Sequence, residues 1–254
     1  MRAGWRGAMI DPGRIVNTTI KGLTRTLCRV DDSQLAKVPE QGPLILVANH
    51  INFLEVPLVL THLKPRPVTG FAKAETWDNP AMAWLFNHWK AIPLRRGHAD
   101  VEAIRRGLQV LAAGGILAVA PEGTRSGDGR LQRGHPGVVT LALRSGAPLL
   151  PMAYFGGESL TQNLRRMRRT DFRIRIGSPF TVVPGDRRVD RVVRQRITDE
   201  IMYQVAALLP STHRGYYADL SSATVEFLRF CHSPEGEAWP ASPAVRAAAP
   251  GWPA

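Results

Sequence analysis

Short apolar runs that end in polar residues recur along this 254-residue chain, and helical patterns separate them. The clearest runs cover residues 44–48, 116–120 and 148–155. Their length and their branched side chains are typical of strands that are buried on both faces of a parallel sheet. Parallel strands need long crossovers, usually helices. The alternation therefore predicts an α/β fold with a mostly parallel central sheet flanked by helices.

The segments between the runs carry their own signals. Apolar residues at helical spacing predict helices over residues 101–112, 136–145 and 189–209. Phe172, Ile174 and Ile176 alternate with arginines, which predicts a half-exposed strand.

Both ends of the chain differ from its middle. Residues 12–30 have the pattern of an amphipathic helix, which either packs on the core or lies in a bilayer interface. Residues 234–254 are rich in Pro and Ala without periodicity, so we expect a disordered tail. The predicted division is an N-terminal helical segment over residues 1–40, a main domain over 41–233 and the tail.

Several classes of protein are disfavoured. No run reaches the roughly 18 apolar residues of a membrane span, and no secretory signal pattern follows the first charges. We therefore expect a cytoplasmic protein, including one that works on a membrane surface. Two cysteines, Cys28 and Cys231, exclude a disulfide framework, and no set of histidines at the spacing of zinc ligands accompanies them.

Positive charge is concentrated in one segment. The chain has 33 Lys+Arg against 21 Asp+Glu, a formal net charge of +12. Residues 165–196 hold eleven arginines and three aspartates, two thirds of that net charge. Such a segment indicates a polyanionic partner, either nucleic acid, an anionic bilayer or an acidic carrier protein, or else a solvated basic face.

The first chemical motif is Asn49-His-Ile-Asn-Phe-Leu-Glu55, at the expected end of a buried strand. Ligands of α/β sheets bind at such carboxyl ends. Residues five apart cannot share a face of one helix, but His50 and Glu55 can meet across a strand-to-helix turn. They would then form a general base and its orienting acid. The alternative is a loop histidine with a glutamate that favours the helix dipole.

The second motif, Pro121-Glu-Gly-Thr-Arg-Ser126, follows the next predicted buried strand. Gly123 permits close backbone approach, Thr124 offers a hydroxyl, and Arg125 offers a two-pronged contact to phosphate. A Walker-type phosphate loop is excluded, since it requires Gly-Lys-Ser/Thr. The alternative is an ordinary loop with a surface arginine.

Taken together, the two motifs resemble the signature of the 1-acylglycerol-3-phosphate acyltransferase family, N-H-x-x-x-x-D followed by F-P-E-G-T-R-S. Further matching blocks are Ile92-Pro-Leu-Arg-Arg96-Gly, Lys73-Ala-Glu75 and Pro148-Leu-Leu-Pro151-Met-Ala-Tyr-Phe-Gly156. The resemblance covers about residues 42–182. Two residues depart from the pattern: Glu55 stands where the family usually has Asp, and Arg95 replaces an aspartate.

The resemblance implies transfer of an acyl group from acyl-CoA or acyl-carrier protein to lysophosphatidic acid, with no metal, cofactor or covalent acyl-enzyme. His50 would be the general base, held by Glu55. Arg96 and Arg125 would bind the acceptor phosphate, with Arg95 beside them. Glu122, Gly123 and Thr124 would shape the pocket, and backbone amides near residue 123 are one guess for the oxyanion donors.

The resemblance also implies a bilayer as the place of work, because the substrates carry long acyl chains. We expect a peripheral protein on the cytoplasmic side of the membrane, with residues 12–30 and 165–196 as docking surfaces. Three alternatives remain: another acceptor such as glycerol-3-phosphate or a different lysolipid, a non-catalytic lipid-binding relative, and a nucleic-acid-binding protein. The last is disfavoured because only Phe172 and Phe180 accompany the arginines.

Overall fold

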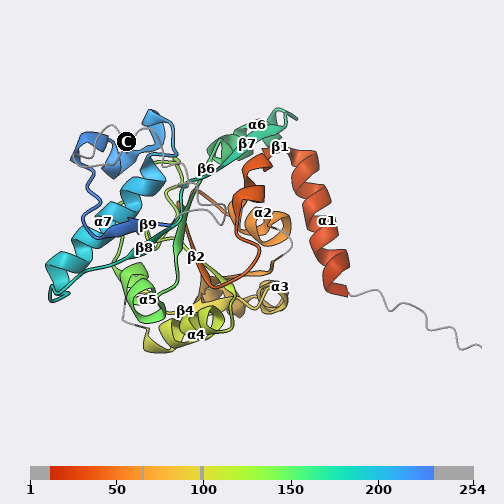
Figure 1. The fold of residues 1–254 in the computed structure, drawn as a ribbon. Helices are drawn as coiled ribbons and strands as arrows, with labels where there is room; N and C mark the ends of the chain where they lie inside the picture. The colour runs from red at the N-terminus through yellow and green to blue at the C-terminus, as the bar shows by residue number, and fades with distance from the viewer. Residues whose placement is uncertain (1–11, 64–65, 98–99, 232–254) are drawn as a thin grey trace, which may run out of the picture.

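The computed structural model describes residues 12–63, 66–97 and 100–231, and these form a mostly parallel sheet between two layers of helices (Figure 1). The strands are β1 (Cys28–Asp31), β2 (Leu44–Ala48), β3 (Val68–Lys73), β4 (Ile92–Leu94), β5 (Ile116–Val119), β6 (Leu149–Phe155), β7 (Thr170–Ile176), β8 (Phe180–Val182) and β9 (Leu228–Phe230). The helices are α1 (Pro12–Leu27), α2 (Glu55–His62), α3 (Pro80–His88), α4 (Val101–Ala112), α5 (Gly137–Ser145), α6 (Leu160–Arg165) and α7 (Arg191–Ala206).

The strand order is β1-β7-β6-β2-β5-β3-β4, with β8 and β9 attached beside β6. Five pairs of neighbouring strands are parallel: β1 with β7, β6 with β2, β2 with β5, β5 with β3 and β3 with β4. Three pairs are antiparallel: β6 with β7, β6 with β8 and β8 with β9. The α/β fold class expected from the sequence is confirmed. Strands β2, β5 and β6 adjoin one another, so the motif after β2 and the motif after β5 emerge at one edge of the sheet.

Strand β2 shows why the apolar runs of the sequence contain no alternating polar residues. Its five residues are all buried, and successive side chains point to opposite faces. Ile45 and Val47 belong to the cluster with α4, α5 and α7, while Leu44 and Leu46 belong to the cluster with α2. Helices cover both faces, so every position of the central strand is apolar.

The predicted end of the first helix is wrong. The helix expected over residues 12–30 ends at Leu27, and Cys28–Asp31 form β1, which pairs with β7 in the main sheet. Residues 28–31 therefore belong to the sheet and not to a separate helical segment. Cys28 and Val30 of β1 pack in the hydrophobic cluster that also contains Phe172 of β7, and this packing favours the strand over a further helical turn.

Helix α1 packs on the rest of the fold, which is one of the two uses left open by its sequence. It packs against α2, and Trp89 donates from Nε1 to the Asn17 side chain at 3.0 Å. Ile15, Thr19 and Leu23, four residues apart, form an exposed row on the helix. None of the helices within the described ranges is both long and apolar enough to cross a membrane. The predicted disordered tail, residues 234–254, lies outside the described residues.

Candidate active site

The end of β2 is fixed to β6 by the side chain of Asn49. Its amide donates from Nδ2 to the Tyr154 carbonyl at 2.9 Å and accepts the Tyr154 amide at 2.8 Å. These two bonds imitate a further step of the β2–β6 ladder, and Asn49 is 3% exposed. The Asn49 side chain thus continues the pairing of β2 with β6 beyond the end of the strand. His50, the next residue, therefore leaves the sheet in a defined direction.

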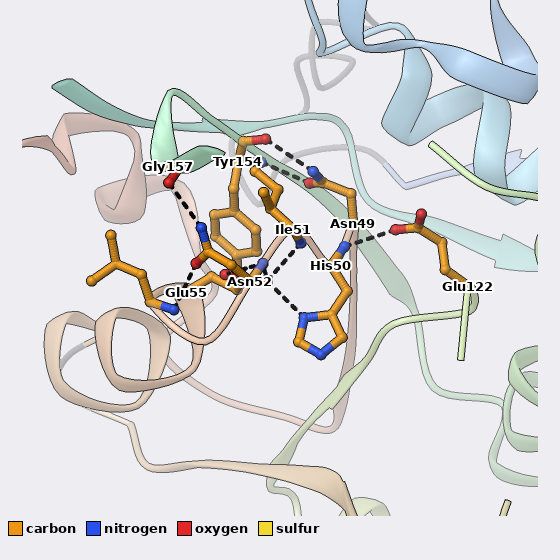
Figure 2. Close-up of polar contacts among 9 residues, drawn as sticks. Asn49, His50, Ile51, Asn52, Glu55, Glu122, Tyr154 and Gly157 are labelled. Atoms are coloured by element: carbon orange, nitrogen blue, oxygen red, sulfur yellow. Dashed lines mark hydrogen bonds and ion pairs between the residues drawn. The ribbon is translucent and has the colours of Figure 1, made fainter. Parts of the chain in front are cut away.

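His50 and Glu55 meet across the strand-to-helix turn (Figure 2), which was expected from their spacing. His50 Nδ1 lies 2.6 Å from Glu55 Oε1, and the two side chains are 16% and 4% exposed. A carboxylate accepts the proton of Nδ1, so Nε2 is the nitrogen left without a proton. Within the described residues no group bonds to Nε2, and Figure 2 shows it turned away from Glu55.

Glu55 is held as firmly as the histidine that it contacts. Its carboxylate also accepts the amides of Ile51 at 2.7 Å and of Asn52 at 3.0 Å. Glu55 is the first residue of α2, so its charge is also stabilised by the helix N-terminus. Asn52 in turn donates to the Gly157 carbonyl at 2.8 Å and accepts the Leu54 amide at 2.8 Å. The turn is thus fixed on both sides of the dyad.

The second motif closes over the first. After β5 the chain forms a loop in which the amide of Ser126 donates to the His50 carbonyl at 2.8 Å, and Gly127 donates to Ile51 at 3.0 Å. Gly123 has φ of +67°, and a Cβ there would lie 3.1 Å from the His135 ring. Glycine is therefore required at this position both by its backbone and by its neighbour. Its amide donates to Ala120, so the expected role of this amide as an oxyanion donor is not available.

Glu122 anchors the two motifs to each other. Its Oε1 accepts the His50 amide at 2.7 Å and its Oε2 accepts the Gln132 amide at 2.8 Å. The side chain is 2% exposed. The sequence grouped Glu122 with the residues that contact substrate, but in the structure both of its carboxylate oxygens accept backbone amides. Glu122 therefore positions His50.

The burial of Glu122 has a measurable consequence for stability. Burial raises the pKa of this carboxyl from 4.5 to about 7, although the amides of Gln132 and His50 lower it. Between those two pKa values the folded chain keeps a proton that the unfolded chain releases. The free energy of unfolding should therefore fall as pH rises from 4.5 to 7, by up to about 3 kcal/mol.

Denaturant unfolding of the wild type and of Glu122→Gln, which cannot titrate there, measures this effect. The stability of the wild type relative to the variant should decline across that range and level off above it. A difference that does not change with pH would contradict the assignment.

A cavity of about 270 Å³ opens beside the dyad. His50 and Glu55 line it together with apolar side chains from α2, β3, α3 and α5, among them Val59, Phe71 and Phe86. Two cations, Lys73 and Arg96, also border it. The site therefore combines one unprotonated imidazole nitrogen, a largely apolar hollow and a basic rim.

The structure gathers only part of the predicted set around this cavity. His50, Glu55, Arg96 and Gly123 line it, whereas Arg95, Thr124 and Arg125 do not, and all three of these are exposed. Arg125 still immediately precedes Ser126, whose amide binds the His50 carbonyl. Arg95 contributes through its amide, which donates to Asp100 at 2.9 Å and so shapes the start of α4.

Several residues that build the site were given no role from the sequence, although most of them stand in the motifs quoted above. Asn49, Asn52 and Tyr154 fix the turn, and Lys73 and His135 line the cavity. Asn52 carried a usable signal, because an Asn side chain ahead of a helix commonly accepts the backbone amide two residues further on, here that of Leu54. Tyr154 carried none, since its role depends on the neighbour of β2 in the sheet. Within residues 12–63, 66–97 and 100–231 no cluster of three ligating side chains could hold a metal.

A family model described as Acyltransferase matches residues 29–155, half of the chain. Among known proteins, the chain is 28% identical over 131 residues to the chloroplastic 1-acyl-sn-glycerol-3-phosphate acyltransferase BAT2 of Brassica napus, covering 50% of this chain and 38% of that one. It is 33% identical over 141 residues to a 1-acyl-sn-glycerol-3-phosphate acyltransferase of Limnanthes alba, covering 54% and 47%.

A third relative is the lyso-ornithine lipid O-acyltransferase of Pseudomonas aeruginosa, 28% identical over 148 residues, with coverage of 52% of this chain and 56% of that one. The matches thus span between about a third and three fifths of the relatives' lengths. The crystal structure of the 1-acyl-sn-glycerophosphate (LPA) acyltransferase PlsC from Thermotoga maritima has the same fold, with a TM-score of 0.53 and 24% identity over 74% of this chain and 76% of that one.

Proposed function

Because this chain belongs to the acyltransferase family, we propose that it transfers a fatty acyl group from a thioester donor to the free hydroxyl of lysophosphatidic acid. The observation that carries the proposal is the His50–Glu55 pair, whose free Nε2 faces an apolar cavity with a basic rim. The donor is acyl-CoA or acyl-carrier protein. No other cofactor is part of the proposal.

In the proposed reaction, His50 Nε2 takes the proton of the acceptor hydroxyl as its oxygen attacks the thioester carbonyl carbon. The tetrahedral intermediate collapses when the carbon–sulfur bond breaks, and the imidazolium returns the proton to the leaving thiolate. Glu55 holds the ring and stabilises its positive charge in between. General-base assistance of this kind contributes about 10²- to 10⁴-fold in rate.

The residues around His50 and Glu55 suit the acyl chain and the phosphate of the proposed substrates. The cavity lining of Val59, Phe71 and Phe86 suits an acyl chain, since each buried CH₂ contributes about 0.8 kcal/mol. Arg96, at the rim, suits the acceptor phosphate, and Arg125 is proposed to join it from the loop that binds the His50 carbonyl.

A second acceptor has specific support. The lyso-ornithine lipid O-acyltransferase of Pseudomonas aeruginosa matches this chain over 56% of its own length, a share within the range of the 1-acyl-sn-glycerol-3-phosphate acyltransferases. Its name gives a lyso-ornithine lipid as the acceptor. An assay with labelled acyl-CoA or acyl-carrier protein and a panel of lysophosphatidic acid, lyso-ornithine lipid, other lysolipids and glycerol-3-phosphate decides between them. The proposal fails if lysophosphatidic acid is not acylated.

Glu55 in place of the usual Asp gives a prediction. Glu55→Asp retracts the carboxylate by about 1.5 Å. The shorter side chain cannot hold the amides of Ile51 and Asn52 and still reach His50 Nδ1. Loss of one hydrogen bond to a charged group corresponds to about a tenfold to 100-fold lower kcat. Steady-state kinetics of the purified variant measure it; an unchanged kcat would show that this turn accommodates either acid.

We also propose that the protein works as a peripheral protein on the cytoplasmic side of an anionic membrane. Support comes from the lipid nature of the proposed substrates and from the exposed row of Ile15, Thr19 and Leu23 on α1. The nucleic-acid alternative loses its stacking residues, because Phe172 and Phe180 are fully buried.

A further inference from the structure

The arginine-rich segment over residues 165–196 is not one surface. Its first part follows the carboxyl end of β6 and ends α6, whereas its last part follows β8, whose Phe180 pairs with Leu149 at the beginning of β6. Figure 1 shows α6 and the start of α7 at opposite ends of the molecule. The expectation of a single docking surface from these residues is therefore wrong, and each part has to be considered separately.

The part at α7 is largely committed to the protein itself. Arg187 and Arg196 both pair with Glu226. Arg194 donates to Thr140 at 3.0 Å. These contacts give the arginines of this part a structural use.

The part at α6, residues 164–169, is different, and we refer to it as the α6 tip. All six residues are exposed, with Leu164 at 55% and Met167 at 95%. The turn is well defined, because Asn163 accepts the amides of Arg166 at 3.0 Å and Arg168 at 2.8 Å. Met167 has a φ of +51°, a strained conformation for a residue with a side chain, at the outermost point of the turn.

The charges of the α6 tip are free. Arg165, Arg166 and Arg168 make no ion pair or side-chain hydrogen bond with any described residue. Arg169 instead donates to the carbonyls of Arg25 and Cys28, the latter at 2.7 Å, and so fastens the tip to the end of α1. The tip therefore presents two exposed apolar side chains and three cations that no residue of the described ranges pairs.

The α6 tip also lies at the edge of the sheet that carries the dyad. Gly157, whose carbonyl accepts from Asn52 beside Glu55, begins the short helical turn Gly157–Ser159 that leads directly into α6. The tip and His50 thus lie at the same end of the sheet, and a membrane or protein bound by the tip would lie at that end as well.

We propose that the α6 tip docks this protein on an anionic bilayer, with Arg165, Arg166 and Arg168 at the lipid phosphates and Leu164 and Met167 inserted between the head groups. Free cations around exposed apolar side chains fit a bilayer better than an acidic protein, because a bilayer offers both negative charge and an apolar interior. The inference deepens the proposed function, since it identifies how a lipid acceptor would reach the site, but the docking itself requires no acyl transfer.

Vesicle flotation tests the charges. The probes are vesicles of phosphatidylcholine alone and of phosphatidylcholine with phosphatidylglycerol in equal parts. The triple variant Arg165→Ser, Arg166→Ser, Arg168→Ser should lower the partition coefficient on the anionic vesicles by about 100-fold, because each arginine at such a surface contributes about fivefold. A matched control removes Arg144, Arg188 and Arg191, which are equally exposed and equally unpaired within the described residues, and it should bind like the wild type.

A second pair of variants tests the apolar part. Leu164→Ser with Met167→Ser should weaken binding by about tenfold or more, and the loss should persist at high salt, where electrostatic attraction is screened. The control, Val183→Ser with Val192→Ser, changes two exposed apolar residues of the other part of the segment and should have no effect. Thermal unfolding of every variant verifies the fold.

Binding of both tip variants equal to that of their controls would overturn the proposal. So would tip variants that float normally but lose affinity for acyl-carrier protein, because the tip would then dock an acidic protein. A wild type that floats in a tip-dependent way but transfers no acyl group would overturn the proposed function and leave the docking proposal intact.

Discussion

Replacing His50 by alanine should lower the rate of acyl transfer by about 10²- to 10⁴-fold and leave the protein folded. The catalytic loss follows from removal of the nitrogen that takes the hydroxyl proton. The fold should persist because the backbone contacts of this residue, to Glu122 and from Ser126, do not involve the ring. The Glu55 carboxylate also keeps the amides of Ile51 and Asn52.

A matched substitution separates catalysis from a general effect of losing a histidine. His88, at the end of α3, stacks on Trp84 and does not line the cavity. His88→Ala should therefore transfer acyl groups at the wild-type rate. Circular dichroism and thermal unfolding establish that each variant is folded. Turnover near the wild-type rate in folded His50→Ala would remove the general-base mechanism.

Changing Glu55 to glutamine should also lower kcat, for a different reason. One oxygen of Glu55, Oε1, accepts from His50 Nδ1 and from the amides of Ile51 and Asn52, so a glutamine oxygen in that place keeps all three contacts. The uncharged amide no longer stabilises the positive charge of the ring after Nε2 has taken the proton. Loss of a hydrogen bond to a charged group corresponds to about a tenfold to 100-fold lower kcat.

Nitrogen NMR of the labelled imidazole gives a readout that simple loss of structure would not produce. The proton should lie on Nδ1 in the wild type and stay there in Glu55→Gln, because the same oxygen position accepts it. KM for the acceptor should change little, because Glu55 positions His50 and binds no substrate in this mechanism. An unchanged kcat in a variant that keeps this tautomer would show that the charge of Glu55 does not assist the base.

The parts of the fold that could be predicted are those whose sequence shows a clear hydrophobic pattern along the whole element. Strand β2 is buried on both faces and is therefore a continuous apolar run, and α4 has the bounds expected, Val101–Ala112. Short edge elements gave no such pattern. Strand β4 has three residues, one of them Pro93, and Cys28 and Val30 of β1 also suit the last turn of a helix.

The site divides in the same way. His50 and Glu55 could be paired from their spacing because both lie on one turn between a strand and a helix. The buried position of Glu122 could not, since it depends on how the loop after β5 folds over the end of β2. The separation of the arginine-rich segment into two surfaces depends on the path of β7 and β8 across the sheet, which no local pattern contains.

The central claim is that this chain transfers an acyl group and does not merely bind or hydrolyse a thioester. The most direct measurement follows the purified protein with acyl-CoA or acyl-carrier protein and lysophosphatidic acid, and counts free thiol and phosphatidic acid in the same reaction. The two products should appear in equal amounts and only when the acceptor is present. Thiol release without phosphatidic acid, or neither product with either donor, would contradict it.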